Sequence, residues 1–146
     1  MSMSNTFEND TLLLVFHNQT LSLIGDATGL RSSATTGSLY IGLHTADPGE
    51  AGTQTTSEIS YTGYARVAVA RSPAAWTVST NTVSNAAAIN FGLCTAGSGT
   101  ATYFSVGTDS SGAGKILYSG ILTAQLAIST GITPSFAISA LTVSLD

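Results

Sequence analysis

The spacing of apolar and polar residues changes once along the chain, near residue 37. Over residues 5–18, NTFENDTLLLVFHN, the apolar residues form a broad face at helical spacing. Asn5 with Glu8 three residues later matches a capping box, and Glu8 and Asp10 fall in the first turn, where negative charge suits the helix dipole. The pattern therefore predicts a helix over residues 5–18 with Asn5 as its N-cap.

Beyond the loop-like residues 26–37 the period becomes two. SLYIGLH, residues 38–44, alternates three aliphatic residues with Tyr40, Gly42 and His44. This alternation predicts a strand with one apolar face, with Leu43 pointing to the core and His44 on the polar face. Further strands are expected at residues 64–71, 76–78, 86–93, 100–108, 115–122, 124–129, 135–139 and 141–146.

Short strands separated by turn signals, with no second long helix, predict a mainly β fold. We expect an antiparallel β-sandwich or a jelly-roll-like barrel preceded by an N-terminal α-helix. The segment SSGAGK is a plausible hairpin connection between residues 103–108 and 115–122. The 146 residues are most simply a single domain, 1–146, with a helical arm and loop over 1–36 and the sandwich over 37–146.

Charge is scarce in this chain. Charged residues make up 8% of it, against roughly 25% in an average soluble domain. Serine and threonine are abundant instead, and the mean hydropathy is positive, which is typical of a packed protein with a hydroxyl-rich surface. Few charges keep copies of such a surface apart, which favours self-association.

The composition also argues against several classes. Four basic residues provide no patch for phosphates, so we expect no nucleic-acid binding. No window of 18 uninterrupted apolar residues exists, so we expect no membrane span. The N-terminal sequence has acidic residues where a secretion signal has basic ones, so we expect no signal peptide.

The stretch LHTADPGEAG places His44, Asp47 and Glu50 three residues apart, which would align them on a helix as metal ligands. Pro48 prevents that helix, and Pro48-Gly49 instead suits a tight turn braced by Asp47. We therefore expect no metal, no cofactor and no catalytic residues here, and interpret residues 43–64 as a long polar surface loop.

Other residues also favour structural over chemical roles. The chain has no G-x-S-x-G elbow of a serine hydrolase. Cys94 lies in an apolar run and is expected in the core, and Trp76 in the core or an interface. Arg66 and Arg71 are five residues apart on one expected strand and hence on opposite faces, so one of them would need an acidic partner if it points inward.

Several segments resemble a known family, namely GSLYIGLHTADPGEAG, YTGYARVAVARS, ATYFSVGT, GKILYSGIL and ITPSFAISALTVSLD. They are similar to small virion structural proteins of tailed bacteriophages and prophages, which include decoration or cement proteins and tail-fibre-like minor structural proteins. The resemblance covers nearly the whole chain. It implies a viral structural protein located in the virion and assembled in the host bacterial cytoplasm, with no enzymatic activity.

The resemblance leaves several roles open. The leading expectation is a capsid decoration or cement protein that binds at junctions of capsid subunits and stabilises the shell. Its partners would be the major capsid protein or another virion protein, and copies of itself in a homo-oligomer such as a trimer. The alternatives are a tail, baseplate or fibre component, and a carbohydrate- or receptor-binding β-sandwich module. The residues expected to contact partners are Phe7, Leu14, Phe16, His44, Asp47, Glu50, Tyr61 and Tyr64.

Overall fold

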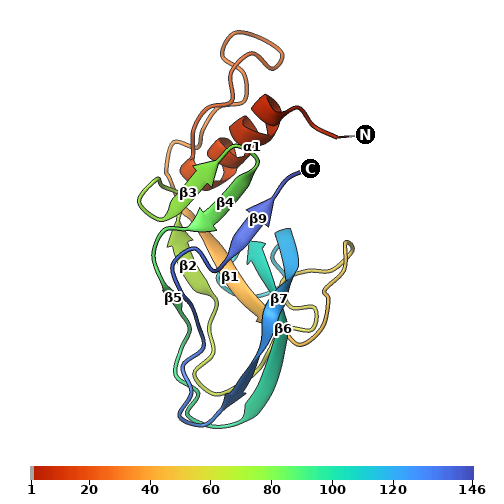
Figure 1. The fold of residues 1–146 in the computed structure, drawn as a ribbon, viewed down its shortest axis with the longest axis vertical. Coiled ribbons are helices and arrows are strands. Elements are labelled where there is room, and N and C mark those ends of the chain that lie inside the picture. The colour runs from red at the N-terminus through yellow and green to blue at the C-terminus, as the bar shows by residue number, and fades with distance from the viewer. Residues whose placement is uncertain (1) are drawn as a thin grey trace. The chain divides into compact units, whose positions relative to one another are not determined.

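Helix α1 spans Asn5–His17 in a computed structural model that describes residues 2–146 (Figure 1). The helix was predicted, but its N-cap is Ser4 and not Asn5: the Ser4 hydroxyl accepts a hydrogen bond from the N–H of Phe7 at 3.4 Å. Serine and asparagine cap helices about equally well, so the sequence does not separate two adjacent candidates. The helix ends at His17, and the C-cap Asn18 has a left-handed backbone (φ 57°). The N–H of Asn18 donates to the carbonyl of Leu13.

Nine strands follow α1 in the described residues, and they form several antiparallel sheets. The strands are β1 (Ser38–His44), β2 (Val67–Ala70), β3 (Trp76–Ser79), β4 (Thr82–Asn85), β5 (Ile89–Asn90), β6 (Ser98–Gly107), β7 (Ile116–Ser129), β8 (Ser135–Phe136) and β9 (Thr142–Ser144). The predicted mainly β fold with one N-terminal helix is confirmed. No closed barrel forms in the described part of the chain, so the barrel alternative does not apply.

The strand order within the sheets is β2-β1-β6-β7, β3-β4-β9 and β5-β8. The predicted hairpin is confirmed, because β6 and β7 pair antiparallel across the turn that contains SSGAGK. The two strands expected at 115–122 and 124–129 are one strand, β7, with a register irregularity near its polar middle. Strand β4 was not predicted: TVSN is short, and Val83 is its only apolar residue.

The chain divides into two compact units. Unit 1 consists of residues 1–38, 70–88 and 136–146, and unit 2 of residues 39–69 and 89–135. The N-terminal helix thus shares a unit with β3, β4 and β9. Cooperative folding of residues 1–146 as a single domain stays a prediction.

In unit 1, α1 packs on β3 and β4 through one apolar edge (Figure 1). Leu12, Phe16 and Trp76 are completely buried, and the rings of Phe16 and Trp76 meet edge to face with centroids 4.8 Å apart. Aromatic pairs favour this geometry. Trp76 is therefore a core residue, one of the two roles expected for it.

In unit 2, β1 lies between β2 and β6, and Leu43 pairs with Phe104 in the antiparallel ladder. Leu43 is completely buried, as predicted. The expected surface loop 43–64 is only partly on the surface. It folds back along β1, where the N–H of Ile59 bonds to the carbonyl of Leu43 at 2.9 Å, and Ile59 becomes buried.

Candidate functional site

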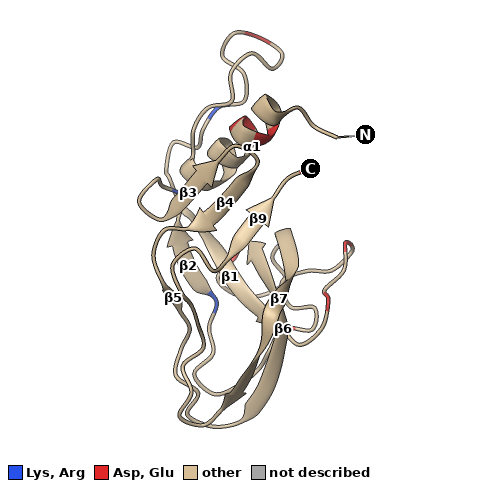
Figure 2. Ribbon diagram, in the orientation of Figure 1, with Lys and Arg blue, Asp and Glu red and all other residues tan. Residues whose placement is uncertain are grey.

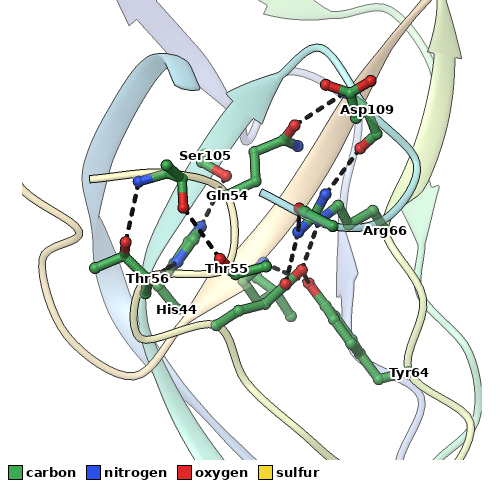
Figure 3. Close-up of polar contacts among 12 residues, drawn as sticks. His44, Gln54, Thr55, Thr56, Tyr64, Arg66, Ser105 and Asp109 are labelled. Atoms are coloured by element: carbon green, nitrogen blue, oxygen red, sulfur yellow. Dashed lines mark hydrogen bonds and ion pairs between the residues drawn. The ribbon is translucent and has the colours of Figure 1, made fainter. Parts of the chain in front are cut away.

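Two loops of unit 2 are joined into one structure. One loop connects β1 to β2 over residues 45–66, and the other is the β6–β7 turn over residues 108–115. Thr53 forms an isolated β-bridge with Lys115, and the N–H of Gln54 donates to the carbonyl of Gly114 at 2.9 Å. The Gln54 side chain, which is completely buried, accepts from the N–H of Asp109 at 2.9 Å (Figure 3).

Arg66 also joins these two loops, through an ion pair within the first loop and hydrogen bonds to the second. Its Nε donates to Oε1 of Glu58 and its Nη2 to Oε2, each at 2.7 Å, which is the two-point geometry that guanidinium and carboxylate favour. Nη1 donates to the carbonyl of Asp109 at 3.0 Å, and Nη2 also donates to that of Gly112 at 2.8 Å (Figure 3). The hydrogen bonds with Glu58 raise the pKa of Arg66. Arg66 is thus an inward-pointing arginine with an acidic partner.

Tyr64 extends this network to β1. Its hydroxyl donates to Oε1 of Glu58 at 2.9 Å and accepts from the N–H of Leu43 at 3.1 Å. Burial raises the pKa of Tyr64, so the hydroxyl stays protonated and remains a donor. One tyrosine therefore links the ion pair to the backbone of the central strand.

His44 is completely buried, although alternation along β1 places it on the face opposite to Leu43. The sequence predicts only that His44 lies on the polar face of β1. Its burial follows from the returning loop, in which Glu58 forms a bridge with His44 and Thr56 contacts its ring. Its Nδ1 lies 2.8 Å from the carbonyl of Thr56, and its Nε2 lies 2.7 Å from Oγ of Ser105 (Figure 3). A carbonyl only accepts, so Nδ1 carries the proton and Ser105 donates to Nε2.

Burial also lowers the pKa of His44, which keeps the imidazole neutral. A serine hydroxyl that donates to a neutral histidine is the first half of a hydrolase site. However, both His44 and Ser105 have no exposed surface, so a substrate cannot reach this hydroxyl in the structure described. The arrangement stabilises the contact of two strands and a loop.

The expected cluster of His44, Asp47 and Glu50 does not converge. Asp47 and Glu50 are exposed, whereas His44 is interior. Asp47 braces its turn as predicted, because its Oδ1 accepts from the N–H of Gly49 at 2.9 Å. No group of three or more His, Cys, Asp or Glu side chains that could hold a metal occurs within residues 2–146.

Asp47 and Glu50 instead line a shallow hollow of ≈ 380 Å³. The other side of this hollow is formed by consecutive residues of β7, from Ile116 to Ser119. The two carboxylates are thus presented at the rim of a partly apolar depression.

The other expected contact residues differ in exposure. Phe16 and Tyr61 are buried, and the Tyr61 hydroxyl donates to the carbonyl of Gly92 at 2.9 Å. Neither side chain presents a surface to a partner, and His44 does not either. Phe7 is 39% exposed, and Leu14 and Tyr64 are partly exposed. A contact role therefore remains a proposal for Phe7, Leu14, Asp47, Glu50 and Tyr64.

Sequence reasoning did not identify Gln54, Glu58, Ser105 and Asp109 as members of the network. One signal was available for Glu58: a buried arginine needs an acid, and Glu58 lies eight residues before Arg66. Charges are sparse along the ribbon, so few acids compete for that position (Figure 2). Ser105 gave no signal, because it is one of many serines.

The family of the chain follows from comparison with known proteins. A family model described as podophage GP4 fiber I protein gp80 matches residues 2–144. The chain belongs to this family, and it is a tailed-phage structural protein located in the virion. No curated protein matches the chain. No helix of the described residues is long and apolar enough to cross a membrane.

Proposed function

From its membership in a phage fibre family, we propose that this protein is a non-enzymatic component of a fibre attached at the tail region of the virion. The family match carries the proposal, because the family is described as a fibre protein and the match covers residues 2–144. The interior position of His44 and Ser105 supports a non-enzymatic role. Capsid decoration, the leading expectation from the sequence, becomes the alternative.

The clamped loops of unit 2 support a role in presenting a fixed surface. Arg66 and Glu58 hold residues 45–66 against the 108–115 turn, so the exposed Asp47 and Glu50 sit on a loop that is already ordered. A surface ordered before binding loses less conformational entropy when a partner docks. We propose Asp47 and Glu50 as contacts to another virion protein that presents basic or hydrogen-bond-donating groups.

The location is tested by separating heads from tails of the purified phage and probing each fraction with an antibody against this protein. The fibre proposal predicts that the signal follows the tail fraction. A signal confined to heads would overturn it and would favour capsid decoration, with the major capsid protein as the partner.

One structural observation favours the decoration alternative. In unit 1, the loop that follows α1 exposes Leu23 (81% exposed), Ile24 and Leu30. Exposed aliphatic residues on a loop could be buried across a junction of capsid subunits, which would stabilise the assembled shell. The same fractionation separates this alternative from the fibre proposal.

Carbohydrate or receptor binding is the remaining alternative. Tyr61 was expected to take part, but its burial removes the ring from any ligand. The hollow beside Asp47 and Glu50, which Tyr118 also lines, is the place where a sugar would fit. A glycan array on which wild type binds and Asp47→Ala does not would support this alternative; an array without binding would exclude the sugars tested.

The contact role of the loop is tested by charge reversal. Because both side chains are exposed, the double variant Asp47→Lys/Glu50→Lys should fold but should enter phage particles in reduced amounts. The matched control is Asp146→Lys, which reverses an exposed acid at the chain end. Normal incorporation of the double variant would exclude Asp47 and Glu50 from the contact.

A further inference from the structure

Strand β7 forms one edge of the four-stranded sheet of unit 2, next to β6. It is 14 residues long and contains no charged residue and no proline (Figure 2). Natural sheets usually protect long edges with lysine, proline or a short strand, because unpaired N–H and C=O groups recruit other strands. Residues 116–122 contain neither lysine nor proline, and one irregularity within this segment is the register shift at Leu117.

Two of the exposed side chains of this edge are large and apolar, and Ser119 lies between them. Ile121 is 69% exposed and Leu117 is 36% exposed, and both belong to the outermost strand of the sheet. Thr53 occupies the edge at Lys115, immediately before β7, and the register with β6 is irregular after Ile121. A second register shift falls at Leu117, because Val106 pairs with Tyr118 and Gly107 with Ile116. The regular part of the edge is therefore short, running from Tyr118 to Ile121 around Ser119.

The sequence of this segment, ILYSGIL, is complementary to itself when read in the opposite direction. With a twofold axis at Ser119, antiparallel pairing places Leu117 opposite Ile121 and Ile116 opposite Leu122. Tyr118 lies opposite Gly120, where the missing side chain leaves room for a ring. Apart from Ser119 on the axis, every cross-strand pair of this register is apolar or matches an aromatic residue with glycine, and such pairs stabilise sheets.

We propose that β7 pairs antiparallel with β7 of a second copy of this chain, about a twofold axis at Ser119, and joins two four-stranded sheets into one. An isologous contact needs one surface that is complementary to itself, and residues 116–122 supply it. No charged side chain lies within residues 116–122 themselves. A hollow of ≈ 380 Å³ lies beside half of the paired segment, between Ile116–Ser119 and the loop residues Asp47, Gly49 and Glu50.

The first test compares two lysine substitutions at exposed positions of the same strand. Wild type should elute as a dimer by size-exclusion chromatography with light scattering. Ile121→Lys places a charge opposite Leu117 at both ends of the register and should reduce the measured mass to one chain. Ala127→Lys lies outside the register, is also exposed, and should remain a dimer. Circular dichroism melting confirms that both variants are folded.

A monomeric wild type, a dimeric Ile121→Lys, or loss of the dimer in both variants would overturn the proposal. A trimer would also overturn it, because a twofold strand pairing joins two copies. None of these outcomes affects the fibre assignment, which the head and tail fractions test separately.

A second test locates the axis. Directly opposite residues of antiparallel strands have Cα atoms about 4.5–5.5 Å apart, within the range that a disulfide spans. Ser119→Cys should therefore form a covalent dimer under mild oxidation. Ser129→Cys, exposed at the far end of β7, should not, because the two copies of residue 129 lie far apart in this register. Cross-linking through residue 129 but not through residue 119 would exclude the proposed register.

Discussion

The guanidinium of Arg66 forms a bidentate ion pair with the carboxylate of Glu58, with Nε–Oε1 and Nη2–Oε2 distances of 2.7 Å. The Arg66 side chain is 2% exposed and that of Glu58 is 16% exposed, so the pair is shielded from water. The same arginine donates to two carbonyls of the β6–β7 turn. Arg66 therefore fixes the loop that carries the proposed contacts Asp47 and Glu50 against the β6–β7 turn.

Removing one member of the pair should therefore be costly. Arg66→Ala leaves Glu58 shielded without its cation and should lower the free energy of unfolding by roughly 3–5 kcal/mol, measured by urea denaturation. The control Lys115→Ala removes an exposed cation close to the same turn and should change it by less than about 0.5 kcal/mol. Equal effects of the two variants would contradict the clamp.

The helix of unit 1 provides the second prediction. Arg71 donates to the carbonyls of Val15 and Leu14, each at 2.6 Å, and these carbonyls lie in the last helical turn, where no helical N–H is available. Arg71→Ala should destabilise the protein by about 2–3 kcal/mol, because hydrogen bonds from charged donors are lost. Thermal melting of Arg71→Ala is compared with that of Arg31→Ala, which removes an exposed arginine. A loss of stability in Arg31→Ala as large as or larger than that in Arg71→Ala would refute the role of Arg71.

Phenylalanine substitutions separate core from surface on α1. Phe16→Ala removes a completely buried ring that packs on Trp76 and should lower stability by about 3–5 kcal/mol. Phe7→Ala truncates a partly exposed ring and should have a much smaller effect on stability. If Phe7 contacts a virion partner, its truncation should instead reduce incorporation into particles. A strongly destabilised Phe7→Ala would remove it from the proposed contact set.

The buried His44 predicts a pH dependence. Burial lowers its pKa in the folded state, so the unfolded chain binds a proton more readily below the ordinary value of 6.5. Because the unfolded state then binds more protons, stability should fall as the pH decreases from about 6.5 toward the lowered pKa. Denaturation of wild type and His44→Gln between about pH 7 and pH 5 measures this. The histidine explanation fails if the variant loses as much stability as wild type over that interval.

The helix, most strands and the β6–β7 hairpin could be predicted because local periodicity and turn residues determine them. The burial of His44 could not, because alternation along SLYIGLH does not reveal that residues 56–59 return along the end of β1 and bring the carbonyl of Thr56 to the His44 ring. A different long-range contact, with the 108–115 turn, buries Gln54, which local composition assigns to a surface loop. The turn at Asp47 could be predicted, since Pro48 stops any helix at this point of the chain.

The expected contact residues were chosen by loop position and residue type, and burial divides them. Asp47 and Glu50 are exposed on either side of the Pro48-Gly49 turn. Tyr61 carries the same surface signal in the sequence, but it packs against Tyr64 with ring centroids 5.4 Å apart. Only the tertiary structure distinguishes an aromatic residue that is buried in a core from one that is exposed and can contact a partner.

The most direct measurement of the central claim is a cryo-electron microscopy map of the intact phage, into which units 1 and 2 are fitted separately. The fibre proposal predicts that both units match density in a fibre at the tail region. Density for these units on the outer surface of the capsid shell, with none at the tail, would contradict it.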